Sequence, residues 1–220
     1  MEKSELFLEA VKTGDVDKVK SLLAEDKSLM EAKTERSETP FILAAHHDQV
    51  EVVDAMIELG FSMDFCEAVA NGHTEIVKKM IIPNPDLNAA FSKDGWSGLQ
   101  LAAYFGHADE LDLLIGYGCD LDARSKSNYH AGTTALLAAI AAGYDEFVDI
   151  LCGKGANPNV ADDTGATPMH AAAAKNNAEV VGILLERHAD STIKNKNGKT
   201  ALDIAIDGGH EDVAVILRDV

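Results

Sequence analysis

Histidine and cysteine are the side chains that most often act as general bases, nucleophiles or metal ligands, and the chain has eight histidines and three cysteines. His46 and His47 are adjacent, but a metal site would need two further ligands, and none lies at a recognisable spacing. Cys66, Cys119 and Cys152 lack the local signature of a catalytic cysteine. No Gly-x-Ser-x-Gly segment or phosphate-binding glycine loop is present either. The sequence therefore predicts no catalytic residues, no metal site and no cofactor.

Acidic residues dominate the charge, because 37 Asp and Glu stand against 19 Lys and Arg, for a formal net charge of −18. Nucleic acid and anionic membrane surfaces repel such a protein, so we expect neither as its main partner. No apolar run approaches the ~18 residues that span a bilayer, and the N-terminal MEKSELFLEAV is amphipathic and acidic, unlike a signal peptide. Three cysteines without disulfide spacing favour a reducing compartment. We therefore expect a cytoplasmic protein that acts as a monomer.

Residues 167–190 indicate which elements position these side chains. The segment begins with Thr167-Pro168, a hydroxyl that can cap a helix followed by a residue suited to the first helical turn. Small residues follow, then the breaker Asn176-Asn177, then apolar residues at the i, i+3, i+4 spacing of an amphipathic helix. This pattern predicts two short helices joined by a tight turn, which need neighbours to bury their apolar faces.

The pattern repeats every 33 residues, since Thr134 lies 33 residues before Thr167 and Thr200 lies 33 after it. With Thr167-Pro168-Met169-His170 as its closest match to T-P-L-H, the chain resembles the ankyrin-repeat family over nearly all of residues 1–220. The resemblance implies an all-α solenoid of stacked helix pairs with short β-hairpin fingers between them. It also implies that His170 binds backbone near a hairpin and ties neighbouring units together, instead of acting as a base.

Extending the register predicts a single domain of about seven repeats across residues 1–220. Gly, Asn or Asp recurs between the two helices of each repeat, and these types best tolerate a left-handed backbone. A second break of similar composition follows the second helix. The repeats start near Glu5, Thr39, Met63, Ser97, Thr134, Thr167 and Thr200. We expect positive φ at Gly14, Asp48, Gly72, Gly106, Gly143, Asn176 and Gly209, and a second break at Asp26, Gly60, Asn84, Gly118, Gly155 and His188.

The step from Thr39 to Met63 is only 24 residues, so about nine residues of the usual period are missing. Residues 60–62 must then join one helix to the next without a finger. We expect a notch there, lined by the short side chains of Ala70 and Asn71.

The family resemblance also indicates where a partner would bind. Trp and Tyr are favoured at the centres of protein interfaces, although a Trp before the repeat motif is frequent in the family and could instead stiffen the hairpin. The finger before Thr134 is four residues longer than usual and carries two further candidates. The candidate partner-binding residues are Trp96, Tyr104, Phe105, His46, His47, Tyr129 and His130.

We therefore expect a non-catalytic module that binds an unidentified protein partner on its concave face. One alternative is an inhibitor or immunity-type protein that masks a basic partner, for which binding would depend steeply on salt. Another is a scaffold for an unrecognised ligand-binding or enzymatic site, which would show a polar pocket with perturbed pKa values.

Overall fold

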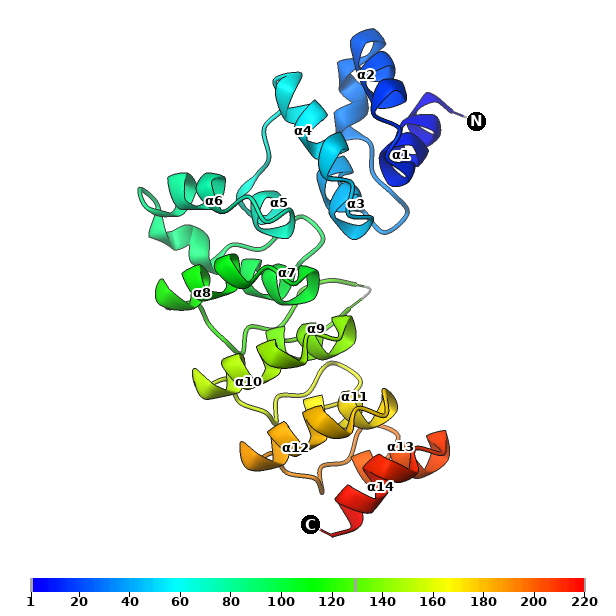
Figure 1. Ribbon diagram of the computed structural model, residues 1–220, viewed down its shortest axis with the longest axis vertical. Coiled ribbons are helices and arrows are strands. Elements are labelled where there is room, and N and C mark those ends of the chain that lie inside the picture. Colours follow the sequence, from blue (N-terminus) through cyan, green and yellow to red (C-terminus); the bar gives the residue numbers. More distant parts are fainter. Residues whose placement is uncertain (1, 129, 220) are drawn as a thin grey trace. The chain divides into compact units, whose positions relative to one another are not determined.

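The computed structural model of this chain describes residues 2–128 and 130–219. Within these residues, fourteen α-helices follow one another in seven consecutive pairs, joined by turns and two short 3-10 helices (Figure 1). The chain divides into two compact units, Met1–Gly98 and Leu99–Val220, which are described separately. No described helix is both long and apolar enough to cross a membrane.

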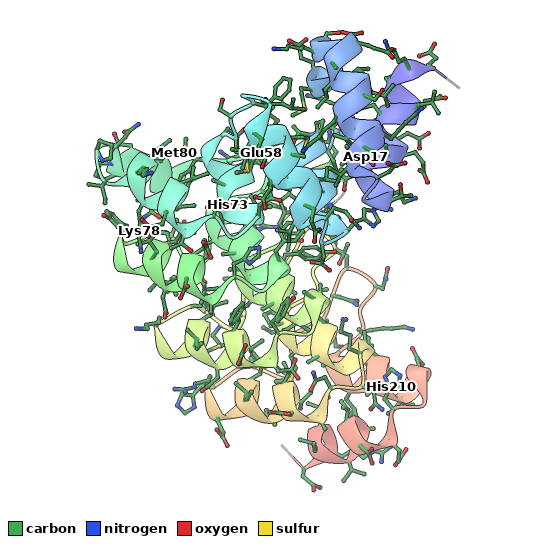
Figure 2. All side chains as sticks on the ribbon, turned by 45° about the horizontal axis from the view of Figure 1, so that its top comes forward. Asp17, Glu58, His73, Lys78, Met80 and His210 are labelled. Atoms are coloured by element: carbon green, nitrogen blue, oxygen red, sulfur yellow. The ribbon has the colours of Figure 1, made fainter. Side chains whose placement is uncertain are left out.

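Unit 1 contains three helix pairs and both 3-10 helices. The two helices of each pair pack against each other, and α1 packs on α3, α2 on α4 and α3 on α5. Glu58 at the end of α4 forms an ion pair of 3.2 Å with Lys20 of α2 (Figure 2). The elements are α1 (Lys3–Thr13), α2 (Val16–Glu25), η1 (Lys27–Glu31), α3 (Pro40–His46), α4 (Val50–Glu58), α5 (Phe65–Ala70), α6 (Thr74–Ile81) and η2 (Pro85–Ala89).

Unit 2 contains four helix pairs, and its first helix begins at the last residue of unit 1. Its first helices are rich in alanine that is fully buried, such as Ala138 and Ala172, which lets consecutive pairs approach closely. Helices this short are marginal alone, so their stability comes from packing. They are α7 (Gly98–Phe105), α8 (Ala108–Gly116), α9 (Ala135–Ala142), α10 (Asp145–Gly153), α11 (Pro168–Ala174), α12 (Ala178–Glu186), α13 (Ala201–Gly208) and α14 (Glu211–Arg218).

The turn between the two helices of each pair confirms the predicted register. All seven predicted residues have positive φ, including the non-glycine residues Asp48 at 52° and Asn176 at 55°. The second column of breaks follows the second helices as predicted, with positive φ at Gly60, Gly118, Gly155 and His188. Asp26 and Asn84 have φ of −151° and −141°, because each precedes a 3-10 helix. Asp26 caps its 3-10 helix through its side chain, and Pro85 disfavours a helical backbone at Asn84.

Threonines cap the first helix of several pairs, as Thr-Pro and its variants predict. The backbone N–H of Ile42 donates to Thr39 Oγ1 at 3.3 Å, and that of Leu137 donates to Thr134 Oγ1 at 3.3 Å. The third pair begins one residue later than predicted, because Asp64, not Met63, caps α5. Asp64 and Glu67 form a reciprocal capping box that replaces Thr-Pro.

The fingers that the family resemblance implies are present as tight turns, too short to form strands. The described residues contain no strand, and the one isolated β-bridge joins Phe91 to Ser97. Each arm is too short for a ladder, and a pair of backbone bonds closes the turn. In one finger Asp162 N donates to Ala166 O at 2.9 Å and Gly165 N donates to Asp162 O at 3.0 Å. In the last finger Asn195 N donates to Lys199 O at 2.9 Å and Gly198 N donates to Asn195 O at 2.8 Å.

The finger predicted to be missing is absent, since α4 ends at Glu58 and α5 begins at Phe65. The expected notch is not lined as predicted. Ala70 is only 1% exposed, and the Asn71 amide donates to the backbone oxygens of Phe41 at 3.2 Å and Glu67 at 2.8 Å. Asn71 therefore ties the second and third pairs together.

Candidate interaction surface

Trp96 belongs to the turn that precedes α7 and lies in unit 1. Its backbone N–H donates to Ser92 Oγ at 2.9 Å, and its carbonyl accepts from the Ser92 N–H at 2.7 Å. The residue is only 7% exposed. These contacts favour a role in holding the finger over a role as an exposed anchor.

Tyr104 and Phe105 lie at the end of α7, in unit 2, and the structure brings their rings together. The ring centroids are 5.3 Å apart in an edge-to-face arrangement, and Phe105 stacks on His107 with 6.3 Å between centroids. All three residues are partly exposed. An edge-to-face pair is a favourable aromatic geometry, so the rings form one ordered cluster on the surface.

Tyr144 adds a ring from the following helix pair, and the sequence analysis missed it. Its hydroxyl donates to the Phe105 carbonyl at 3.4 Å, and the residue is 36% exposed. A Cβ at Gly106 would collide with the Tyr144 ring, so this ring needs a glycine beneath it. Tyr144 also stacks on the buried Phe147, with 5.5 Å between centroids. We call Tyr104, Phe105, His107 and Tyr144 the aromatic patch.

His46 and His47 are exposed at the end of α3, in unit 1. His46 Nδ1 lies 2.9 Å from Glu38 Oε1. This contact with His46 lowers the pKa of Glu38, although partial burial of the carboxyl opposes the effect. His46 is therefore held against the preceding finger.

The long finger of unit 2 holds the last two candidates. The carbonyl of His130 accepts a hydrogen bond from the Ser125 hydroxyl, and the residue is exposed. Tyr129 lies outside the described residues. The structure thus places Tyr104 with Phe105 and leaves His130 on a separate element of the same unit.

His170 makes the structural contacts that the family resemblance implies. Its Nδ1 accepts from the backbone N–H of Thr167 at 3.2 Å, and its Nε2 lies 3.0 Å from the carbonyl of Lys199 on the next finger. Because a carbonyl only accepts, Nε2 must carry the proton. Gln100 makes the same kind of tie, donating to the carbonyls of Ala123 at 2.7 Å and Thr133 at 2.9 Å.

His210 ties the last two pairs in a different way. It caps α14, and its Nδ1 lies 2.8 Å from the carbonyl of Ala173 in α11 (Figure 2). His170 and His210 therefore both hold neighbouring helix pairs together.

Glu67 is a buried carboxylate in unit 1, only 8% exposed. The Thr39 hydroxyl donates to its Oε1 at 2.6 Å and the Asp64 N–H to its Oε2 at 2.8 Å. Burial raises the pKa of Glu67, although these two hydrogen bonds partly oppose the change. The adjacent cavity, about 10 Å³, has room for about one water molecule and is too small for an organic substrate.

The cysteines are held as thiols. Burial raises the pKa of Cys66 to about 12 and those of Cys119 and Cys152 to about 11. A thiol is a poor nucleophile until it ionises. In the part of the chain that the structure describes, no three His, Cys, Asp or Glu side chains are grouped so as to hold a metal ion.

Short helix pairs that stack through small residues, joined by tight turns and tied by side chains at fixed positions, define a helical repeat protein. A family model that describes three copies of the ankyrin repeat matches residues 65–162 and 151–219. The chain belongs to the ankyrin-repeat family, whose repeats generally mediate protein–protein interaction.

Curated relatives come from plants, animals and bacteria. The chain is 39% identical over 71 residues to the ADP-ribosylation factor GTPase-activating protein AGD4 of Arabidopsis thaliana. The matched segment covers 32% of this chain and 9% of that protein. The chain is 29% identical to human ankyrin repeat domain-containing protein 63, over 67% of this chain and 42% of that protein. It is 26% identical to the Escherichia coli K12 ankyrin repeat protein YahD, over 72% of this chain and 84% of that protein. The chain spans less than half of the first two relatives.

Proposed function

We propose that this chain is a non-catalytic module that binds a protein partner through the concave face of its repeats, formed in this family by the first helices and the fingers. The observation that carries the proposal is the aromatic patch. Tyr104 and Phe105 close the first helix of a repeat, and their partly exposed rings are ordered by contacts with His107 and Tyr144. Rigid aromatic side chains of this kind bind at a small conformational cost.

The other candidate residues take secondary roles in this proposal. Because Trp96 is buried in its turn, we assign it to holding the finger in place. His46, His47 and His130 are exposed on α3 and on the long finger, so they remain candidates for contact with the partner. Tyr129 remains a candidate for contact with the partner on the basis of the sequence alone. We also propose that the seven helix pairs act as the seven repeats of one domain.

Affinity capture with the purified full chain tests this function. The bait proteins are the wild type, Tyr104→Ala and Tyr117→Ala, and the extract comes from the source organism. Tyr117 is a matched control, because it lies in the same helix pair and is 39% exposed. We expect the wild type and Tyr117→Ala to capture the same protein, and Tyr104→Ala to bind it more weakly by about 2 kcal/mol or more. Equal capture by all three, with the fold intact, would place the site elsewhere.

A further inference from the structure

We propose that the aromatic patch receives a basic segment of the partner, with an Arg or Lys side chain stacked on its rings and paired with carboxylates beside it. This inference rests on the protein-binding function proposed above and adds the chemistry of the partner. It concerns unit 2 alone.

The rings of the patch are held in place before any partner arrives. Phe105 contacts both Tyr104 and His107, and the Tyr144 hydroxyl bonds to the Phe105 backbone. Gly106, with φ of 79°, provides the space in which the Tyr144 ring lies across the turn. A face made of ordered rings suits a planar or cationic group, because the ring quadrupole attracts positive charge.

Carboxylates follow two of these rings by two residues in the sequence. His107 and Tyr144 are the residues that immediately precede α8 and α10, and both helices begin with acidic first turns. Asp109 and Glu146 are exposed in those turns. Neither forms an ion pair among the residues that the structure describes. The helix N-termini offset part of this negative charge.

Asp145 strengthens the negative potential at the same turn. Its Oδ2 accepts from the Asn177 amide at 2.8 Å, while its Oδ1 is buried and accepts no hydrogen bond from the described residues. Arg187 of unit 2 pairs with Asp149, at 2.7 Å. The region therefore combines partly exposed, ordered rings with exposed carboxylates in the two helix turns that follow them.

These two features together select a basic partner over the other possibilities. A neutral apolar segment would use the rings and leave the carboxylates without a new counter-ion, and an acidic segment would be repelled. An arginine can stack on an aromatic ring and donate to a carboxylate at once. The net charge of −18 would also steer a basic partner towards the protein from a distance.

The test uses a random peptide library displayed on phage and selected against the purified full chain. The library favours no charge, so the composition of the enriched peptides reports what the surface prefers. We expect enrichment in Arg and Lys. The affinity of one enriched peptide is then measured by fluorescence anisotropy for the wild type and for the variants.

Two variants examine the two halves of the proposal. Tyr104→Ala should weaken binding by about 30-fold, as loss of an aromatic anchor does. The double variant Asp109→Asn/Glu146→Gln should weaken it by about 10-fold and flatten its salt dependence. Tyr117→Ala and the double variant Glu179→Gln/Glu186→Gln are the controls. The control Glu179→Gln/Glu186→Gln removes two negative charges from exposed positions of α12, as many as Asp109→Asn/Glu146→Gln removes from α8 and α10. It should change the affinity for the peptide by less than about 3-fold.

The outcomes separate this inference from the proposed function. Enriched peptides that are not basic, or no enrichment at all, would overturn the basic partner. If such peptides still lose affinity with Tyr104→Ala, the aromatic site stands and only its charge preference is wrong. If basic peptides bind all variants equally, both the site and the inference fail. Because Asp109 and Glu146 are exposed, their neutralisation keeps the test decisive even if Tyr104→Ala disturbs α7.

Discussion

Replacing Thr39 by valine should destabilise unit 1 by about 2–5 kcal/mol, because one hydroxyl makes two contacts. It accepts the Ile42 N–H at 3.3 Å, and loss of such a helix cap costs about 0.5–2 kcal/mol. It also donates to Glu67 Oε1 at 2.6 Å, and a hydrogen bond to a charged group contributes about 1.5–3 kcal/mol. Since Glu67 is only 8% exposed, water replaces the lost donor poorly.

Thr134→Val is the matched control for this experiment. Thr134 caps α9 through a bond of the same length, 3.3 Å from Leu137 N, and bonds to no carboxylate among the residues that the structure describes. Its replacement should therefore cost only about 0.5–2 kcal/mol. The difference between the two variants, about 1.5–3 kcal/mol, measures the bond between Thr39 and Glu67.

Urea unfolding at slightly alkaline pH provides the measurement. Trp96 is the only tryptophan, lies in unit 1 and is 7% exposed, so its fluorescence reports the unfolding of that unit. The Thr134→Val variant lies in unit 2 and is followed by far-ultraviolet circular dichroism. Losses for the two variants that agree within about 0.5 kcal/mol would refute the claim that the Glu67 bond stabilises the fold.

Burial raises the pKa of Glu67, so the folded chain binds this proton more tightly than the unfolded chain, and wild-type stability should fall as pH rises from the ordinary glutamate pKa through the raised one. Glu67→Gln removes this loss, and its stability relative to wild type should climb across that window in urea titrations; a constant difference would contradict the effect. Leu184→Ala should cost about 2–5 kcal/mol, because Leu184 is fully buried, whereas Lys196→Ala on an exposed finger should cost under about 0.5 kcal/mol; equal denaturation midpoints would refute this placement. Asn176→Ala should lower stability by about 1–2 kcal/mol in thermal melts, because φ is 55° there, and Asn176→Gly should not. Cys66, 3% exposed with its pKa raised to about 12, should react with a thiol reagent more slowly than the other two cysteines, as mass spectrometry of the labelled protein would show.

The sequence predicted those features that one repeat determines by itself. Asp48 and Asn176 were assigned to left-handed turns although neither is glycine, because both stand in the same column as five glycines and tolerate that conformation. The caps at Thr39 and Thr134 follow from the residue type and the helix that comes next. His170 was assigned its backbone tie from the family resemblance, and the structure shows the contact.

The sequence was less informative where neighbouring repeats determine the structure. Tyr144 was missed because its importance comes from Gly106, in the preceding repeat. Trp96 was chosen as a candidate from its residue type, which does not show that only 7% of it is exposed. A periodic pattern identifies each repeat, but it does not show which side chains contact the neighbouring repeat.

The third residue of each first helix shows how one position can tie different neighbours. His170 and Gln100 both carry N–H groups, and both donate to carbonyls of the finger that follows. An ionised carboxylate has no proton to donate, so Glu67 at the same position cannot make that contact. It accepts the hydroxyl of Thr39 from the preceding helix pair instead. The chemical type at this position therefore decides whether the side chain bonds to the following finger or to the preceding helix pair. Between the second and third pairs, where the finger is missing, Glu67 provides the link by accepting a hydrogen bond from Thr39.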